Sequence, residues 1–247
     1  MKRVIFRLVL SLFVFRPAFS QNYIPIDIWQ PFISVGYESA STGDVSIFYH
    51  NIVQSYRDQG IPVPTQTDFG RTLAVNGGFL YCPIASIWFG LSMGCLYSPA
   101  FSDYQDYAGT LKVDGSVVTY PITIITQYKL TDVGSFPILI IVKPGFSYFA
   151  SKITQDLEFA GSPQNDFHSK ISSYSWAFCI EAGLGTSVQI GRITATIESG
   201  YHLSGVGPLD YHQNPGPAND PYWGERHFMW SMGQSGFIVR LTTGFNL

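Results

Sequence analysis

Residues 173–203 read SYSWAFCIEAGLGTSVQIGRITATIESGYHL, two runs of alternating side chains joined by the dipeptide Gly191-Arg192. In both runs nearly every second residue is apolar, with Thr186 and Ser199 as exceptions, and most of the residues between them are small or polar. In the second run the apolar members are Ile193, Ala195, Ile197, Tyr201 and Leu203. A period of two predicts β-strands with two different faces. A two-residue connection that contains glycine predicts an antiparallel hairpin between them.

The same pattern recurs along the chain and predicts an all-β fold. We expect eight strands, at residues 32–40, 72–82, 87–98, 117–130, 137–150, 173–190, 193–203 and 227–247. The gaps after the second, fourth and sixth strands are short, and the other four are long and polar. Outer-membrane barrels have short periplasmic turns and long external loops. The sequence therefore predicts an eight-stranded antiparallel up-and-down transmembrane β-barrel in the bacterial outer membrane, in contact with outer-membrane lipid.

Composition favours this class over a soluble one. Only 13% of the 247 residues are charged and 16% are aromatic, whereas about a quarter of a soluble domain is charged. The face opposite the apolar one is rich in Gly, Ser and Thr, which suits the inside of a narrow barrel whose side chains fill the lumen. A net charge of −3 gives no basic patch, so we expect no nucleic-acid partner.

Aromatic residues near the strand ends suit the two interfacial girdles of such a barrel. They are Tyr37, Tyr81, Trp88, Tyr97, Tyr128, Tyr148, Trp176, Tyr201 and Trp230. The fourth and fifth strands fit the pattern less well, because Ile125, Leu139 and Ile141 point inward by parity and Pro144 lacks a ladder donor. We expect a bulge at that point.

The N-terminus has the pattern of a secretory signal peptide. Lys2, Arg3 and Arg7 precede an apolar run over residues 8–15, and Ala18-Phe19-Ser20 supplies small residues for cleavage. We expect a signal peptide over 1–20 and a barrel domain over 21–247. The alternative is an uncleaved membrane anchor, for which this run is short. The three cysteines, Cys82, Cys95 and Cys179, lack metal-site spacing, and we expect mostly free thiols and no metal or cofactor.

The alternating strands, the Gly191-Arg192 turn and the ending Gly244-Phe245-Asn246-Leu247 resemble the PorT-like and OmpA-like outer-membrane barrel families. The resemblance covers nearly all of the mature chain. It implies that Phe245 and Leu247 form the terminal signal read by the outer-membrane assembly machinery during insertion, although a terminal aromatic is commoner there than leucine. PorT-like resemblance also implies a supporting role in secretion or envelope assembly.

Five charged residues face the lumen by parity, and they are the first candidate site. They are Glu38, Lys143, Glu181, Glu198 and Arg240. We expect Arg240 to lie between Glu198 and Glu38, with Lys143 across the lumen. Buried charges persist when they are paired, which predicts an ion network that plugs the barrel. The alternative is a gated polar path for small solutes.

His202 and Ser204 lie two apart at the outer end of the seventh strand, a possible base and nucleophile. They loosely resemble the His-x-Ser of outer-membrane lipid A deacylases, with Asp210 or Glu225 to orient the histidine. Gly205 replaces the asparagine that follows the serine in those enzymes, and parity turns the pair inward. The alternative function is thus a deacylase-like enzyme.

The long external loops over 41–71 and 204–226 are the third candidate site. They hold Tyr49, His50, Tyr56, Pro62-Val63-Pro64, Tyr211, His212, Tyr222 and Trp223. Aromatic loops on a rigid scaffold are common binding surfaces. We expect a non-enzymatic structural or accessory protein that binds another envelope component through its loops or rims, and a narrow solute-binding barrel is a further alternative.

Overall fold

The computed structural model describes residues 25–63, 69–84, 86–204, 210–213 and 234–247. Several expectations fall outside these residues: the signal peptide over 1–20, the start of the last predicted strand at 227–233, and individual loop residues. Those loop residues are Pro64, Gly205, Tyr222, Trp223 and Glu225, and the girdle residue Trp230 of the last predicted strand also falls outside.

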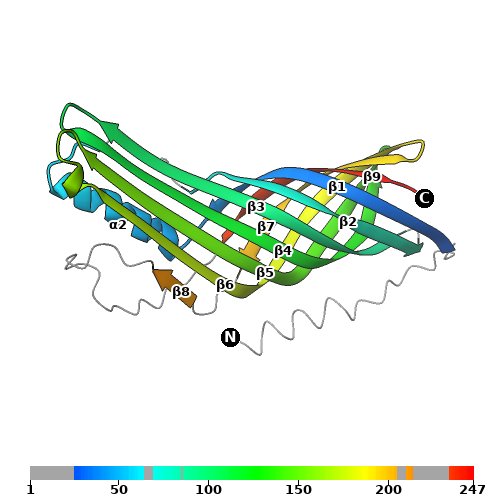
Figure 1. The fold of residues 1–247 in the computed structure, drawn as a ribbon. Coiled ribbons are helices and arrows are strands. Elements are labelled where there is room, and N and C mark those ends of the chain that lie inside the picture. The colour runs from blue at the N-terminus through cyan, green and yellow to red at the C-terminus, as the bar shows by residue number, and fades with distance from the viewer. Residues whose placement is uncertain (1–24, 64–68, 85, 205–209, 214–233) are drawn as a thin grey trace, which may run out of the picture.

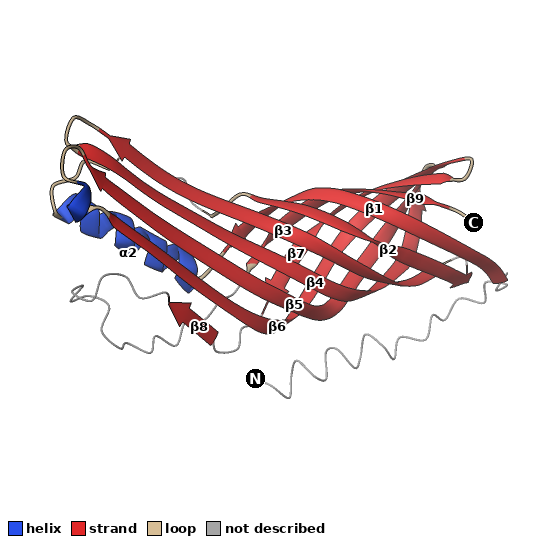
Figure 2. Ribbon diagram, viewed as in Figure 1, coloured by secondary structure: helices blue, strands red, loops and turns tan. Residues whose placement is uncertain are grey.

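Within the described residues, eight strands close into one antiparallel barrel, as the alternation predicts (Figures 1 and 2). Around the ring they are β1 (Pro25–Ser41), β2 (Thr72–Ile84), β3 (Ile87–Gln105), β4 (Gly109–Val133), β5 (Phe136–Phe159), β6 (Phe167–Ile190), β7 (Ile193–Ser204) and β9 (Ser235–Phe245). Pairing of β1 with both β2 and β9, and of β5 with β6, closes the ring. Apart from the pair of β1 and β9 that closes the ring, each strand of the barrel pairs with the barrel strands before and after it in the sequence. The short strand β8 lies outside this ring and pairs with β6.

Two of the predicted loops are strands. Residues 99–116 and 151–172 were expected outside the barrel wall, yet β3 and β4 continue to a tight turn at 106–108, and β5 and β6 continue to residues 159 and 167. The four strands thus project beyond the ends of the other strands as one curved sheet (Figure 1). We call this part of β3–β6 the external sheet. A 3₁₀ turn at Pro163–Asn165 joins β5 to β6.

The expected loop over 41–71 contains a helix, α2 (Asp44–Asp58), that packs on one face of the external sheet (Figure 2). Its apolar residues recur at a helical spacing on one side and are buried against the sheet. They are Val45, Tyr49, Ile52, Val53 and Tyr56. The other predicted loop, over 204–226, contains β8 (Asp210–Gln213), which pairs with β6 at Ile171–Tyr174.

Two tyrosine hydroxyls fasten α2 to the sheet. Tyr49 donates to the carbonyl of Val113 at 3.1 Å, and Tyr56 donates to the side-chain oxygen of Gln155 at 3.0 Å. Phe69 packs edge-on against Tyr49 with ring centroids 5.4 Å apart. Gly115 makes room for this packing, since a Cβ there would come within 2.6 Å of the Phe69 ring. The external sheet therefore has its own hydrophobic core.

The expected bulge near Pro144 is absent from β4 and β5 as described. The register of these strands is the same on both sides of Pro144 and shifts only between Lys129 and Thr131. Ile125, Leu139 and Ile141 do point inward and are buried, so apolar lumen side chains, not a bulge, account for the parity. Trp88 has the inward parity of Gly90 and Ser92 and does not belong to the outer girdle.

No helix in the described part of the chain has the length and apolarity needed to cross a membrane.

Candidate functional site

The outward face of the barrel wall is a continuous band of exposed apolar side chains. On β4 these include Ile122 and Ile124, and on β9 they include Val239 and Leu241. At the side nearer the external sheet the band ends in paired aromatic residues. The ring centroid of Tyr148 is 6.4 Å from that of Tyr120 and 5.2 Å from that of Trp176. A closed sheet with an apolar outside and a charged inside is stable only where hydrocarbon surrounds it. The chain is an outer-membrane β-barrel protein.

No family model matches this outer-membrane β-barrel protein, and no curated protein matches it. Among solved structures it is similar to Ail, the attachment invasion locus protein of Yersinia pestis, in complex with sucrose octasulfate, at 12% identity and a TM-score of 0.42 over 89% of this chain and 99% of that one. It is also similar to the outer membrane protease OmpT of Escherichia coli, at 7% identity and a TM-score of 0.41 over 92% and 99%. Neisserial surface protein A matches at 10% identity and a TM-score of 0.34, over 89% and 97%.

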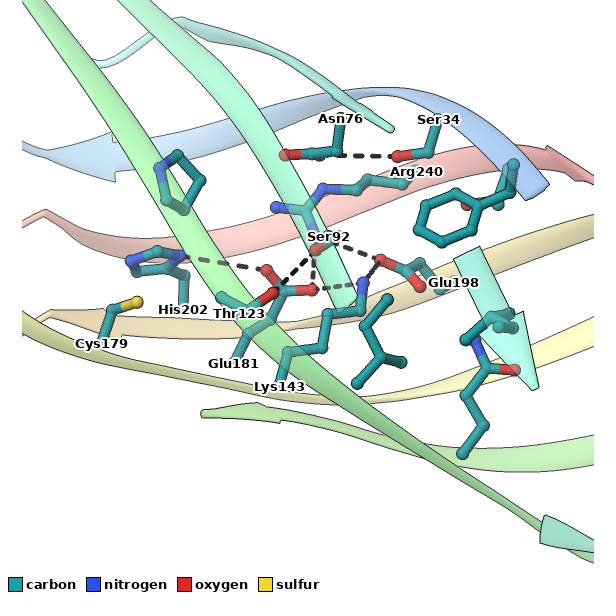
Figure 3. A pocket seen from close by; sticks show the side chains of 16 residues that line it. Ser34, Asn76, Ser92, Thr123, Lys143, Cys179, Glu181, Glu198, His202 and Arg240 are labelled. Atoms are coloured by element: carbon teal, nitrogen blue, oxygen red, sulfur yellow. Dashed lines mark hydrogen bonds and ion pairs between the residues drawn. The ribbon is translucent and has the colours of Figure 1, made fainter. Parts of the chain in front are cut away.

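Four of the five predicted lumen charges meet in one cluster, which we call the lumen cluster (Figure 3). The ammonium nitrogen Nζ of Lys143 is 2.8 Å from Oε1 of Glu181 and 2.5 Å from Oε1 of Glu198. Arg240 contacts Glu181 and lies 3.2 Å from Glu198. Two cations and two carboxylates therefore alternate, and all four residues are 4–8% exposed. Each charge has an opposite partner, which is the condition for keeping it buried.

Strand register explains this arrangement. Lys143 pairs directly with Glu181 between β5 and β6, and Glu198 pairs directly with Arg240 between β7 and β9. Opposite Arg240 on β1 stands Gly36, where a Cβ would come within 2.3 Å of the arginine Cγ. Glycine at this position therefore leaves room for the arginine to extend across the lumen to Glu181.

Arg240 does lie between β7, with Glu198, and β1, with Glu38, but Glu38 forms no hydrogen bond or ion pair with the cluster among the described residues. Glu181 takes the place that was predicted for Glu38 as the second partner of Arg240. Glu38 is fully buried, but neither carboxylate oxygen has a hydrogen-bond partner among the described residues. It pairs across the sheet with Ile238, two residues from Arg240. The arginine turns toward β6, and parity alone does not reveal that direction.

The lumen around the cluster is filled. The space open to the centre of a water molecule between the lining side chains is about 20 Å³, enough for about one buried water. On β5, Leu139 and Ile141 point inward between Lys143 and the periplasmic turn and are buried. The described side chains therefore pack closely around the charges.

The candidate pair of His202 and Ser204 also lies inside the barrel. His202 is 2% and Ser204 7% exposed, and neither forms a hydrogen bond with the other in the described structure. Nδ1 of His202 is 3.9 Å from Glu181, so the nearest carboxylate belongs to the lumen cluster. Asp210 lies on β8. Neither side chain of the pair faces lipid, where an acyl chain would be found.

The other predicted residues occupy separate places. Cys82, Cys95 and Cys179 form no disulfide, and the described residues hold no group of three or more His, Cys, Asp or Glu that suits a metal ion. Phe245 and Leu247 are exposed at the periplasmic end of the barrel. The backbone N–H of Leu247 donates to the carbonyl of Trp29 at 2.9 Å, which ties the last residue to β1.

Charged residues gather on the outward face of the external sheet. Lys112 lies 3.1 Å from Asp114 on β4, and His168 on β6 lies 2.9 Å from Asp156 on β5. The hydrogen bond to Asp156 raises the pKa of His168, and that to Asp114 raises the pKa of Lys112. Such a face suits water, which places the external sheet outside the bilayer.

The residues of α2 and of the external sheet were predicted to be loops, although their sequence carries the patterns of a helix and of strands. The spacing of residues 45, 49, 52, 53 and 56 is the helical repeat that marks α2. The alternation of Leu111, Val113 and Val117 with Lys112, Asp114 and Ser116 continues the strand pattern beyond the membrane. Both patterns were present, but their charged residues resemble those of loops.

Proposed function

We propose that this protein is a non-enzymatic accessory component of the outer membrane that binds another envelope component through its external sheet. The finer expectation, a PorT-like supporting role in secretion or envelope assembly, is part of this proposal. The observation that carries it is the external sheet with its own core, because a rigid platform beyond the membrane is what a partner-binding barrel requires.

The packing of α2 supports a binding platform over a set of solvated loops. The core beneath it includes buried residues from the helix and from β3, β4, β5 and β6. A preformed surface loses little conformational entropy when a partner binds. On its outer side α2 exposes Ile47, which is 60% accessible, so the platform presents apolar area as well as charge.

The filled lumen argues against transport as the main activity. Paired charges and inward leucine and isoleucine side chains occupy the described lumen, and an eight-stranded barrel leaves little space beyond its side chains. We expect the purified protein to give no steady conductance in planar lipid bilayers. Large, stable openings would contradict the plugged lumen.

Affinity purification from detergent-solubilised membranes tests the proposed function. We expect one envelope protein to co-purify in stoichiometric amount with the wild type. Tyr49→Ala, which removes the main contact of α2 with the sheet, should reduce the yield of that partner at least fivefold. Ile197→Val, on the lipid-facing side of β7, is the matched control and should leave the yield unchanged. Absence of any stoichiometric partner would overturn the proposal.

Lipid A mass spectrometry tests the enzymatic alternative directly. We expect the acyl-chain pattern of lipid A to be identical with and without expression of the protein, because His202 and Ser204 are buried in the lumen. Loss of an acyl chain that Ser204→Ala restores would contradict the non-enzymatic assignment.

A further inference from the structure

One margin of the external sheet lacks a neighbouring strand in the described structure. The last pair between β2 and β3 joins Leu73 to Tyr97, whereas β3 continues to Gln105. Beyond Ser98, β3 pairs only with β4 among the described residues. The cause lies before β2, where Phe69 leaves the line of the strand and is buried against Tyr49.

The hairpin between β3 and β4 determines which backbone groups face this margin. The N–H of Asp106 donates to the carbonyl of Gly109 at 3.0 Å, so 106 and 109 form a hydrogen-bonded pair. In an antiparallel ladder such pairs alternate with non-bonded ones. Ala100, Ser102 and Tyr104 therefore direct their N–H and C=O groups to β4. Phe101, Asp103 and Gln105 direct theirs to the open side.

The opposite margin of the same sheet already has an added strand. There, β7 stops at the pair between Ser204 and Cys179, and β8 covers β6 farther along at Ile171–Tyr174 (Figure 1). The external sheet thus accepts a short strand at one margin from its own chain. At the other margin the N–H and C=O groups have no strand partner among the described residues, and such a row is a template for a strand from elsewhere.

The surroundings of the β3 margin indicate the chemistry of that strand. Phe101 is 53% exposed on the outward face. Beside it lies a hollow of about 650 Å³. Side chains of β3, β4 and β5 line it, among them Tyr97, Pro99, Phe101, Lys112 and Thr154. A strand added beside β3 would place every second side chain on the same outward face as Phe101. An apolar side chain there would pack on Phe101.

We propose that the open margin of β3, Phe101 to Gln105, is where the envelope protein partner adds an extended segment, antiparallel to β3, with an apolar side chain beside Phe101. This is recognition by strand addition, in which the main chain supplies the hydrogen bonds and alternate side chains supply selectivity. The inference rests on the proposed function, since it specifies how the partner binds.

Proline at position 103 provides the sharpest test. Asp103→Pro removes a donor that faces the open margin, whereas the bonds to β4 come from residues 102 and 104. Asp103→Ala is the matched control, because it removes the carboxylate and keeps the N–H. In purifications from solubilised membranes we expect Asp103→Pro to retain less than a tenth of the partner and Asp103→Ala at least half. All three proteins should show the same heat-modifiable migration, which reports a folded barrel.

Amide hydrogen exchange on the wild type is independent of any substitution. In the purified protein alone, the N–H groups of Phe101, Asp103 and Gln105 should exchange rapidly, and those of Ser102 and Tyr104 slowly. With the co-purified partner bound, the first three should become at least tenfold slower. Slow exchange of all five amides in the isolated protein would overturn the proposal, because the margin would already be covered.

The outcomes separate this inference from the proposed function. A partner that Asp103→Pro retains in full would overturn strand addition and leave the accessory function standing. A wild type without any partner would overturn both. Co-purification of an untagged second copy, lost in Asp103→Pro, would show that the margin joins two copies and would overturn its assignment to another protein.

Discussion

The two halves of β4 follow one alternation with opposite polarity. In the external half, the inward residues Leu111 and Val113 are apolar and the outward residue Lys112 is charged. In the membrane half, the inward residue Thr123 is polar and the outward residue Ile124 is 55% exposed. The change occurs between Ser116 and Tyr120, at the aromatic band. Side-chain parity is continuous along the strand, so the surroundings of each half, lipid or water outside and α2 or the lumen inside, decide how polar each face is.

The outward faces of β5 and β6 change in the same way. Lys152 and His168 lie on the outward face outside the membrane, and Ile140 and Phe178 lie on it within the membrane. The protein therefore has two packing systems on shared strands. Outside the membrane, water covers the outward face and α2 covers the inward face, so the core lies beneath the helix. Within the membrane, lipid covers the outward face and paired charges fill the inside. We expect substitutions to act on one system and spare the other.

The largest effect should come from the membrane half. Arg240→Met leaves Glu181 and Glu198 buried with Lys143 as their only cation, and breaking a buried pair in this way costs about 3–5 kcal/mol. Urea unfolding of the barrel in detergent measures this loss. Arg240→Lys, which keeps the charge, should recover part of it. Equal urea midpoints for the wild type and Arg240→Met would show that the cluster does not stabilise the barrel.

Next should come a large effect confined to the external half. Tyr49→Ala removes a buried ring and its bond to Val113, and such truncations cost about 3–5 kcal/mol. We expect α2 to become sensitive to protease while the barrel keeps its heat-modifiable migration. Ile47→Ala, on the exposed side of α2, is the control and should leave protease resistance unchanged. Loss of the folded barrel in Tyr49→Ala would mean that the two halves are not independent.

A pair of substitutions on the outward face of β4 tests the inversion itself. Ile124→Arg places a charge in the lipid band and should cost about 2–4 kcal/mol near the bilayer midplane. Lys112→Ile, twelve residues earlier on the same face, should change stability by less than about 0.5 kcal/mol, as exposed sites usually do. Unfolding in lipid vesicles measures both. Similar costs at the two sites would contradict a bilayer boundary between them.

The smallest effect concerns the exposed pair of His168 and Asp156. Their hydrogen bond raises the pKa of His168 above its ordinary value of about 6.5. The pair therefore stabilises the external half below that pH, and its contribution disappears as the pH rises through the raised pKa. Titration of the His168 ring by NMR should show the raised pKa, and Asp156→Asn should lower it. An unchanged pKa in that variant would rule out the pair as the cause.

Sequence analysis predicted the membrane half of the fold well and the external half poorly. The runs over 173–190 and 193–203 carry the alternation without interruption, and both strands were predicted within a residue at their shared turn. The strand residues around Lys112 and Lys152 alternate as well, but their charges made them resemble loops. Local composition reports the medium around a strand, and water surrounds both loops and external strands.

For the lumen cluster, the location of the charges could be predicted from the sequence, but the partner that each charge contacts could not. Parity placed Lys143, Glu181, Glu198 and Arg240 inside the lumen, since each lies on the small-residue face of its strand. Parity could not determine that Arg240 contacts Glu181 instead of Glu38, because both carboxylates are within reach of a long side chain. That choice depends on the direction of the side chain across the lumen and on the space beside Gly36.

The order of residues along the chain was sufficient to determine the barrel, its eight strands, its lipid-facing side and its location in the outer membrane. These follow from a local rule, since a side chain alternates between two faces whatever the distant strands do. Only the tertiary structure decided the pairing of the lumen charges, the docking of α2 and the open margin of β3. Each of these depends on contacts between segments far apart in the sequence, and such contacts exist only once the barrel has closed.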